Sequence, residues 1–180
     1  GSLWNEGFVG VYDGSRIEVF ESGTFDGGIL RVEGSGSSLS VSSGGLFGAI
    51  SEIYVSLNGS MSIDGLVYLD ETVMTISDSG SEVVFETSSS CHDLSVSKYW
   101  KEASVQNGGL LSVLSNTHDI LTGTTEIMNE DSHLKILVGN SSKFVGESLS
   151  VLDESTSWIS SDVLFEVSLF AVDHGEVSLC

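Results

Sequence analysis

Gly36-Ser37-Ser38-Leu39-Ser40-Val41 decides the fold of this chain, because its pattern of a turn followed by an apolar-x-apolar unit recurs at a fixed step. Two apolar residues separated by one residue have the period of a β-strand with one buried face. The units of this series start at residues 17, 39, 61 and 83, so three successive steps are 22 residues each. A repeat of this length indicates stacked structural units. The four units are Ile17-Glu18-Val19, Leu39-Ser40-Val41, Met61-Ser62-Ile63 and Val83-Val84-Phe85.

Two further series of apolar units run beside the first with about the same period. Gly, Ser, Asn and Asp separate the units, and these residues favour turns. Two or three short strands therefore form one coil of about 22 residues. Ala103-Ser104-Val105 is expected to continue the first series. The second series is Leu30-Arg31-Val32, Ile53-Tyr54-Val55, Met74-Thr75-Ile76 and Leu94-Ser95-Val96, and the third is Leu46-Phe47, Leu66-Val67-Tyr68 and Leu110-Leu111.

A single coil cannot bury its apolar side chains, so we expect parallel coils stacked about 4.8 Å apart. The predicted fold is an all-β, right-handed parallel β-helix (β-solenoid), with the handedness taken from the general preference for right-handed crossovers. An antiparallel β-sandwich stays open as the alternative. A leucine-rich repeat is disfavoured because its asparagine ladder and helical segment are missing. The predicted internal columns are Ile17, Leu39, Met61 and Val83, and beside them Val19, Val41, Ile63 and Phe85.

The repeat becomes irregular towards the carboxyl end. We expect a single β-solenoid domain over residues 1–180, with regular rungs over 1–113 and irregular rungs over 114–180. Leu134-Lys135-Ile136 restarts the repeat after a gap, which predicts an insertion in Ser115–Thr125, and later rungs are expected at Trp158 and Val177-Ser178-Leu179. The apolar stretch 163–172 is expected to be a capping strand pair or a surface for a neighbouring domain, because the end of a stack needs a cover.

The net charge of −20, from 26 acidic and 6 basic side chains, restricts the partners. Such a surface repels the phosphates of nucleic acids and anionic lipid head groups. No apolar run reaches the length of a membrane span, so direct membrane insertion is not expected. Cations, neutral glycans and proteins remain as partners.

No constellation predicts a catalytic, cofactor-binding or metal-ligating residue. Each histidine lies near an aspartate, but adjacent strand residues point to opposite faces, so turn segments explain these pairs better than a metal site or a Ser-His-Asp triad does. The acidic clusters fit solvated turns, and weak Ca²⁺ binding is the open alternative. The pairs are His92-Asp93, His118-Asp119, Asp131/His133 and Asp173-His174, and the clusters are Asp70-Glu71, Asn129-Glu130-Asp131 and Asp153-Glu154.

Three carboxylates and one aromatic segment are the remaining candidates. Asp13, Glu33 and Asp78 lie near equivalent turns and are the candidates if the chain cleaves a neutral glycan. For Tyr99-Trp100 we favour a half-buried corner, with a contact to sugar or protein as the alternative. Cys91 and Cys180 are too few for a disulfide scaffold and are expected to be free thiols. Asn58-Gly59-Ser60 and Asn140-Ser141-Ser142 match the N-glycosylation pattern, which matters only in a secreted eukaryotic protein.

Val32-Glu33-Gly34-Ser35-Gly36-Ser37-Ser38-Leu39-Ser40-Val41 resembles the repeats of autotransporter-type passenger domains and related bacterial surface adhesins. Similar phrases lie at Glu21–Phe25, Gln106–Val113 and Ser155–Trp158. The resemblance implies a right-handed β-helix at the cell surface, acting as a non-enzymatic extracellular adhesin or structural stalk that binds host or cell-surface glycans or proteins. Self-association is an open alternative. The alternatives are a carbohydrate-active β-helix enzyme (a polysaccharide lyase or glycoside hydrolase) and a structural subunit of a filament or fibre.

Overall fold

The chain folds as a parallel β-solenoid. The computed structural model describes residues 2–4, 7–48, 50–69, 71–86, 90–91, 99–115, 120–138, 143–160 and 164–179. These residues form about 7 turns with a spacing of about 22 residues and no helix. Every ladder between the described strands is parallel, which excludes the antiparallel sandwich and confirms the predicted solenoid.

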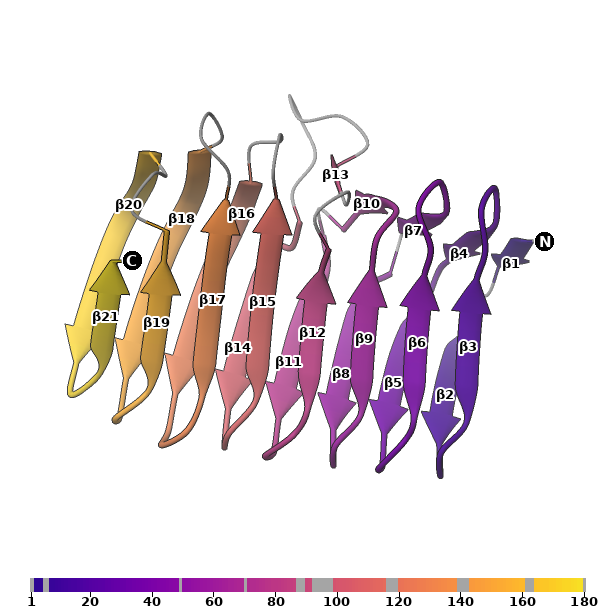
Figure 1. Cartoon of the computed structure of the whole chain (residues 1–180), viewed down its shortest axis with the longest axis horizontal. Coiled ribbons are helices and arrows are strands. Elements are labelled where there is room, and N and C mark those ends of the chain that lie inside the picture. Colours follow the sequence, from indigo (N-terminus) through magenta and orange to yellow (C-terminus); the bar gives the residue numbers. More distant parts are fainter. Residues whose placement is uncertain are drawn as a thin grey trace.

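Three sheets make up the sides of the coil (Figure 1). Sheet A is a five-stranded sheet over the amino-terminal part, with β1 (Ser2–Trp4), β4 (Thr24–Asp26), β7 (Leu46–Gly48), β10 (Leu66–Tyr68) and β13 (Ser90–Cys91). Sheet B has eight strands: β2 (Phe8–Tyr12), β5 (Ile29–Glu33), β8 (Glu52–Ser56), β11 (Val73–Ser77), β14 (Glu102–Gln106), β16 (Ile120–Met128), β18 (Lys143–Leu152) and β20 (Leu164–Asp173). Sheet C also has eight: β3 (Arg16–Val19), β6 (Ser38–Val41), β9 (Ser60–Ile63), β12 (Glu82–Phe85), β15 (Leu110–Ser115), β17 (His133–Val138), β19 (Thr156–Ile159) and β21 (Glu176–Leu179).

The predicted columns are confirmed in sheet C. Ile17 pairs with Leu39, Leu39 with Met61, and Met61 with Val83, so the 22-residue step is a true structural register. The neighbouring column continues in the same way to Phe85. In sheet B the second series is confirmed through Met74-Thr75-Ile76, while Leu94-Ser95-Val96 lies outside the described residues.

Two segments belong to other series than predicted. Ala103 pairs with Met74 in sheet B, so Ala103-Ser104-Val105 continues the second series and not the first. Leu111 pairs with Val83 in sheet C, so Leu110-Leu111 continues the first series and not the third. Both errors have one cause: extra residues enter the chain between Phe85 and Ala103 and shift everything after them.

The predicted insertion in Ser115–Thr125 is therefore wrong. Leu111 pairs directly with Leu134, and Ala103 pairs with Thr125, which are close to ordinary steps of the repeat. After β13 the described residues add no strand to sheet A, and the later strands of sheet B lengthen to 9 or 10 residues. Among the described residues, the coil therefore has three sides up to β13 and two sides after it.

The carboxyl-terminal rungs are also corrected in detail. Ile159, and not Trp158, is the partner of Ile136, so Trp158 pairs with Lys135 on the outward side of sheet C. The described part of the apolar stretch is one strand, β20, and not a capping pair; it pairs with β18 as the last strand of sheet B. Val177-Ser178-Leu179 does form the last strand of sheet C, as predicted.

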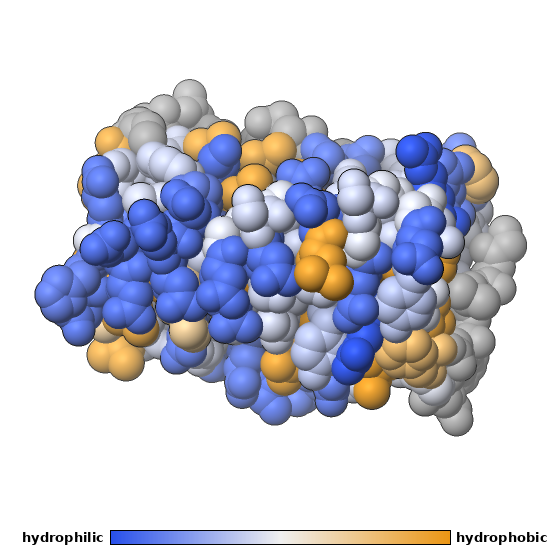
Figure 2. Space-filling model, turned by 90° about the horizontal axis from the view of Figure 1, so that it is seen from below, coloured by the Kyte–Doolittle hydropathy of each residue, from blue (hydrophilic) through white to orange (hydrophobic). Residues whose placement is uncertain are grey.

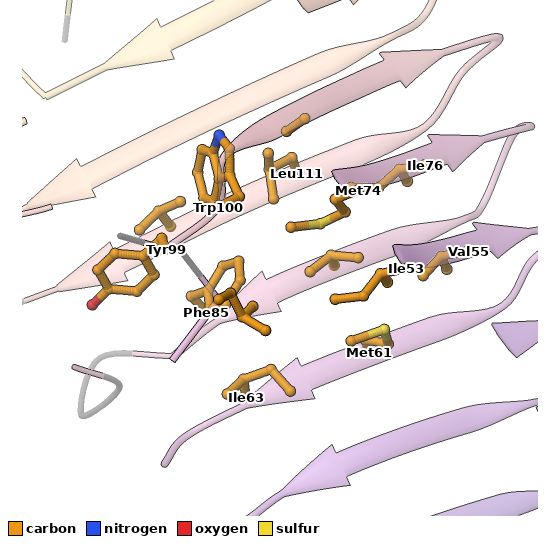
Figure 3. Close-up of a cluster of buried hydrophobic side chains, with 14 of the residues drawn as sticks. Ile53, Val55, Met61, Ile63, Met74, Ile76, Phe85, Tyr99, Trp100 and Leu111 are labelled. Atoms are coloured by element: carbon orange, nitrogen blue, oxygen red, sulfur yellow. The ribbon is translucent and has the colours of Figure 1, made fainter. Parts of the chain in front are cut away.

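A continuous apolar interior fills the coil (Figure 3). Alternation along each strand sends every second residue inward, and these side chains stack on those of the next coil. Phe85 lies fully buried with Tyr99 and Trp100, at ring-centroid distances of 5.1 Å and 5.8 Å. The prediction of a half-buried corner for Tyr99-Trp100 underestimated their burial, because both side chains are fully buried. The indole N–H of Trp100 donates to Thr125 Oγ1 at 3.1 Å, which satisfies its one donor.

Buried serines hold successive turns together on the edge between sheets B and C. The backbone N–H groups of Gly14, Asn58 and Gly108 donate to the hydroxyl oxygens of Ser37, Ser81 and Ser132, each at 3.1 Å. These serines lie one coil further along and are fully buried. Each hydroxyl oxygen therefore accepts a hydrogen bond from a backbone N–H group in a turn that has no partner in the strand ladders. The surface over these turns is largely hydrophilic (Figure 2). In the described part of the chain no helix is long and apolar enough to cross a membrane.

Candidate functional site

An arginine–aromatic cluster lies on the outer face of sheet B, near its amino-terminal end. It consists of Phe8 and Tyr12 on β2, Arg31 on β5 and Tyr54 on β8. These residues alternate with the buried residues Val11, Leu30, Val32, Ile53 and Val55. Because alternation sends them outward, and because the register places Gly10, Arg31 and Tyr54 side by side, the cluster spans three coils.

Gly10 makes room for the cluster. A Cβ atom at Gly10 would lie 2.1 Å from Cε2 of Tyr12, so the Tyr12 ring occupies the space where a side chain would be. The Tyr12 ring thereby stacks with that of Phe8, with centroids 6.5 Å apart and planes at 23°. Phe8 is 50% exposed and Tyr12 37% exposed. Two neighbouring aromatic side chains are thus partly exposed to solvent.

Arg31 lies between aromatic rings. Its guanidinium carbon is 5.7 Å from the centroid of Phe8 and 5.0 Å from that of Tyr54, both within the range of cation–π attraction. Its Nη1 atom lies 3.9 Å from Oε1 of Glu33. These contacts orient the guanidinium while much of the side chain stays exposed, and a planar guanidinium offers several donors in a fixed geometry.

Tyr54 is fixed by a carboxylate. Its hydroxyl donates to Oε2 of Glu52 at 2.7 Å. This hydrogen bond is the largest cause of a raised pKa of Tyr54, to which partial burial and the negative charge of Glu52 add, while Arg31 opposes the rise. The phenol therefore stays protonated, and it orients Glu52 on the side of Tyr54 that lies away from Glu33. The cluster offers apolar ring faces, guanidinium donors and carboxylate acceptors on one surface.

A second candidate is a shallow hollow of about 350 Å³ beside sheet C, which we call the sheet C hollow. Glu82, Asp131 and His133 supply its titratable side chains. Nδ1 of His133 lies 2.5 Å from Oγ1 of Thr156, and its ring lies 4.9 Å from the ring of Trp158. The hollow is lined by Ser79, Gly80, Ser81, Glu82, Gly108, Leu110, Asp131 and His133.

Trp158 and Lys135 flank the sheet C hollow. The ammonium of Lys135 lies 5.4 Å from the centroid of the Trp158 ring, so one ring carries contacts to both Lys135 and His133. Trp158 is partly buried, whereas Phe8 is 50% exposed, so less of the Trp158 ring is available to a ligand. The described residues contain no group of three or more His, Cys, Asp or Glu that could hold a metal ion.

The carboxylates predicted from sequence do not converge. Asp13 and Asp78 occupy left-handed turn positions, with φ of 53° and 73°, in coils that are three steps apart. Three strand spacings amount to about 14 Å. Glu33 instead lies beside Arg31 in the cluster. These three residues therefore do not form a pair of cooperating acids.

The described His–Asp pairs do not come together with one another to form a common site. His92 and His118 lie outside the described residues. Nδ1 of His174 lies 2.9 Å from a carboxylate oxygen of Asp173, but both side chains are about four-fifths exposed at the end of β20. His133 belongs to the sheet C hollow together with Asp131, at positions that the sequence singled out without showing the hollow.

Sequence reasoning missed the arginine–aromatic cluster. A signal was present: Arg31 and Tyr54 hold the same middle position in successive units of the second series. Phe8 and Tyr12 precede the first unit that was recognised, so their strand was not identified. Comparison of the chain with protein-family models, with curated proteins and with solved structures found no match.

Proposed function

We propose that this chain is a non-enzymatic, extracellular surface module that binds glycans through the arginine–aromatic cluster. The carrying observation is the exposed pair Phe8 and Tyr12 beside Arg31 on a flat face of a rigid solenoid. Sugars present apolar C–H faces and rings of hydroxyl groups. The ring faces suit the first, and Arg31, Glu33 and Glu52 supply donors and acceptors for the second.

The charge of the chain supports a neutral glycan as the ligand. A net charge of −20 repels acidic polysaccharides at long range. Arg31 is already partly compensated by Glu33, so it acts as a directional donor more than as a free positive charge. A neutral glycan has no such repulsion to overcome.

Binding to an immobilised array of neutral and acidic glycans, followed by calorimetric titration of the best neutral oligosaccharide, tests the proposal. We expect neutral glycans to bind, and Phe8→Ala or Arg31→Gln to weaken the affinity at least tenfold. Each change removes a contact of about 1–2 kcal/mol, and a factor of ten corresponds to 1.4 kcal/mol.

Phe20→Ala is the matched control for Phe8→Ala, because Phe20 is 66% exposed and lies outside the cluster. The control should leave the affinity unchanged. Circular dichroism should show that all three variants keep the wild-type β-signal. Absence of glycan binding, or equal binding by the wild type and Phe8→Ala, would overturn the proposal.

A carbohydrate-active enzyme is the second candidate, and the sheet C hollow favours it. Glu82 and Asp131 line one hollow together with His133, and glycoside hydrolysis uses paired carboxyl groups. A screen for release of reducing ends or unsaturated products from polysaccharides tests this function. Turnover that disappears in Glu82→Gln or Asp131→Asn, with the fold intact, would favour the enzyme over the adhesive module.

A further inference from the structure

We propose that Asn107 is a modification site, at which the fold controls spontaneous deamidation through the hydroxyl group of Ser132. Asn107 is followed by Gly108, and the sequence contains a second Asn-Gly pair at Asn58-Gly59. Asparagine followed by glycine is prone to this reaction, because glycine has no side chain that hinders ring closure. The two pairs have different surroundings in the structure. This inference does not depend on glycan binding.

The reaction needs only water as a co-reactant. The Gly108 nitrogen loses its proton and forms a bond to Cγ of Asn107, while the bond from Cγ to Nδ2 breaks and ammonia leaves with that proton. The product is a five-membered succinimide ring. Water then opens the ring at either carbonyl group. One opening leaves aspartate in the normal main chain, and the other leaves isoaspartate, whose main chain contains one extra methylene group.

The folded turn directs the Gly108 nitrogen away from this reaction. Its N–H group donates to Oγ of Ser132 at 3.1 Å, and Ser132 is fully buried in the next coil. The deprotonated nitrogen would attack along the direction of its former N–H bond, and that direction points to Ser132. Asn107 has a left-handed φ of 52°, and the turn is closed by the Gly109 N–H, which donates to the Gln106 carbonyl oxygen at 3.1 Å. Ring closure therefore requires local opening of the turn.

The side chain of Asn107 is accessible to the reaction. Asn107 is exposed, so water reaches it and ammonia can leave. Its Oδ1 atom accepts a hydrogen bond from Nδ2 of Asn129 at 2.9 Å, one coil further along. The hydroxyl of Ser132 and the amide of Asn129 are both side-chain contacts from that next coil. A local separation from it therefore frees the Gly108 nitrogen and the Asn107 side chain together.

The Asn58-Gly59 pair is held more firmly. The Gly59 N–H donates to the main-chain carbonyl oxygen of Ser56 at 2.9 Å. Gly59 is buried and lies close to the preceding coil, because a Cβ atom at Gly59 would be 2.2 Å from the carbonyl oxygen of Val32. Movement of this nitrogen would disturb main-chain contacts and not only a side-chain contact. We therefore expect deamidation of the folded chain to be faster at Asn107 than at Asn58.

The turn position of Asn107 accepts the aspartate product. Asp78, Asn107 and Asn129 follow ladder-aligned residues of β11, β14 and β16, so they hold the same position in successive coils. All three have positive φ, and Asp78 is thus a native example of aspartate there. Isoaspartate instead lengthens the main chain between β14 and β15. The isoaspartate form should therefore unfold at a lower temperature than the Asn107→Asp variant, as measured by circular dichroism.

Peptide mapping by mass spectrometry of the full chain, incubated at mildly alkaline pH with and without guanidinium chloride, tests the inference. The unfolded chain gives the intrinsic rate of deamidation at each Asn-Gly pair. We expect the folded wild type to react more slowly than the unfolded chain at both pairs, with Asn107 less protected than Asn58. Chromatographic separation of the aspartate and isoaspartate peptides identifies the two products.

Ser132→Ala tests the controlling contact. Removal of the hydroxyl frees the Gly108 N–H, so the rate at Asn107 in the folded chain should rise about tenfold, which corresponds to 1.4 kcal/mol, about one hydrogen bond. The rate at Asn58 in the same variant should stay unchanged. Ser81→Ala is the matched control, because Ser81 is equally buried but accepts from the N–H of the asparagine itself and not of the glycine that follows. It should change the rate at Asn58 much less than Ser132→Ala changes the rate at Asn107.

Three results would overturn the inference. The first is a folded wild type in which Asn58 is as reactive as Asn107, once each rate is divided by its rate in the unfolded chain. This comparison decides the matter even if Ser132→Ala does not fold. The second is a folded Ser132→Ala chain with the wild-type rate at Asn107. The third is a folded Ser132→Ala chain in which both pairs react faster by the same factor. Circular dichroism shows which variants are folded.

Discussion

Replacing Phe85 by alanine should separate the solenoid into two weakly coupled halves. Phe85 is fully buried at the point where the extra residues enter the chain, and its ring contacts both Tyr99 and Trp100. In a solenoid each coil contacts only its neighbours, so cooperativity passes through every interface in turn. Weakening this interface should therefore affect coupling as well as total stability.

The expected cost of Phe85→Ala is about 4 kcal/mol. Burial of a phenylalanine side chain stabilises by about 1.5–3 kcal/mol, and each of its two aromatic contacts adds about 0.5–1.5 kcal/mol. The range for Phe→Ala in a packed core is about 3–5 kcal/mol, which agrees with this sum. Phe85→Leu retains most of the volume and should cost about 1.5 kcal/mol or less.

Urea unfolding followed by tryptophan fluorescence and by far-ultraviolet circular dichroism measures both effects. In the wild type the two probes should give one coincident transition. In Phe85→Ala the midpoint should fall, and the two curves should separate, because Trp100, one of three tryptophans, adds a local signal from the weakened interface while dichroism reports all coils. Val84→Ala is the matched control, since Val84 is the outward neighbour on the same strand and is only partly buried.

The reasoning would be refuted by a loss below about 1 kcal/mol in Phe85→Ala, because a fully buried ring cannot be removed at so small a cost. It would equally be refuted if Val84→Ala were as destabilising as Phe85→Ala. Coincident probes in Phe85→Ala would show that the halves remain coupled through other contacts, and would refute the separation into halves.

Three further results are expected. Ser81→Ala should destabilise by about 1–3 kcal/mol in urea unfolding, because it leaves the Asn58 N–H without its acceptor. Spectrophotometric titration near 295 nm should show Tyr54 ionising above the ordinary pKa of 10.0. Since the folded-state pKa is raised, the stability that the Tyr54–Glu52 hydrogen bond contributes is present below pH 10.0 and is lost as pH rises through the folded-state value. Gly123→Ala should lower the thermal midpoint, because its Cβ would lie 1.9 Å from a backbone carbonyl oxygen.

Each of these results has a matched comparison. Ser79→Ala changes an exposed serine two residues away and should be nearly neutral. Glu52→Gln should bring the ionisation of Tyr54 back towards its ordinary pKa, because it removes the main cause of the shift. Gly146→Ala should be milder than Gly123→Ala, since its nearest neighbour is the side-chain oxygen of Thr122 at 3.1 Å. A reversed order in any pair would contradict the structural reason given for it.

The fold could be predicted from sequence because one residue pattern gives both the length of the repeat and the positions of the buried side chains. Ile17, Leu39, Met61 and Val83 recur at a constant step with a turn before each, and only stacking satisfies them together. The prediction lost register after Phe85, since nothing in the sequence distinguishes a missing unit from a lengthened connection. Leu110-Leu111 fits either series locally, and only the ladder to Val83 decides between them.

The candidate site could not be predicted in the same way. The side chains of Phe8, Arg31 and Tyr54 are distant in sequence and meet only because three coils place them on one face. The sequence points instead to residues with familiar chemistry, such as Asp13 and Asp78, which lie in turns. Asp13 and Asp78 have positive φ, so their place in the sequence is explained by the backbone conformation that the turns require.

The entry point after Phe85 has a consequence for how such a molecule can change length. The ladders that span this point stay parallel, although their partners are 28 or 29 positions apart in sequence instead of about 22. The chain can therefore take up added residues between Phe85 and Ala103 while the ladders on either side stay parallel. New loops could be grafted there, and whole coils could be duplicated or deleted elsewhere, while the spacing of outward groups along the rod keeps its unit of about 4.8 Å.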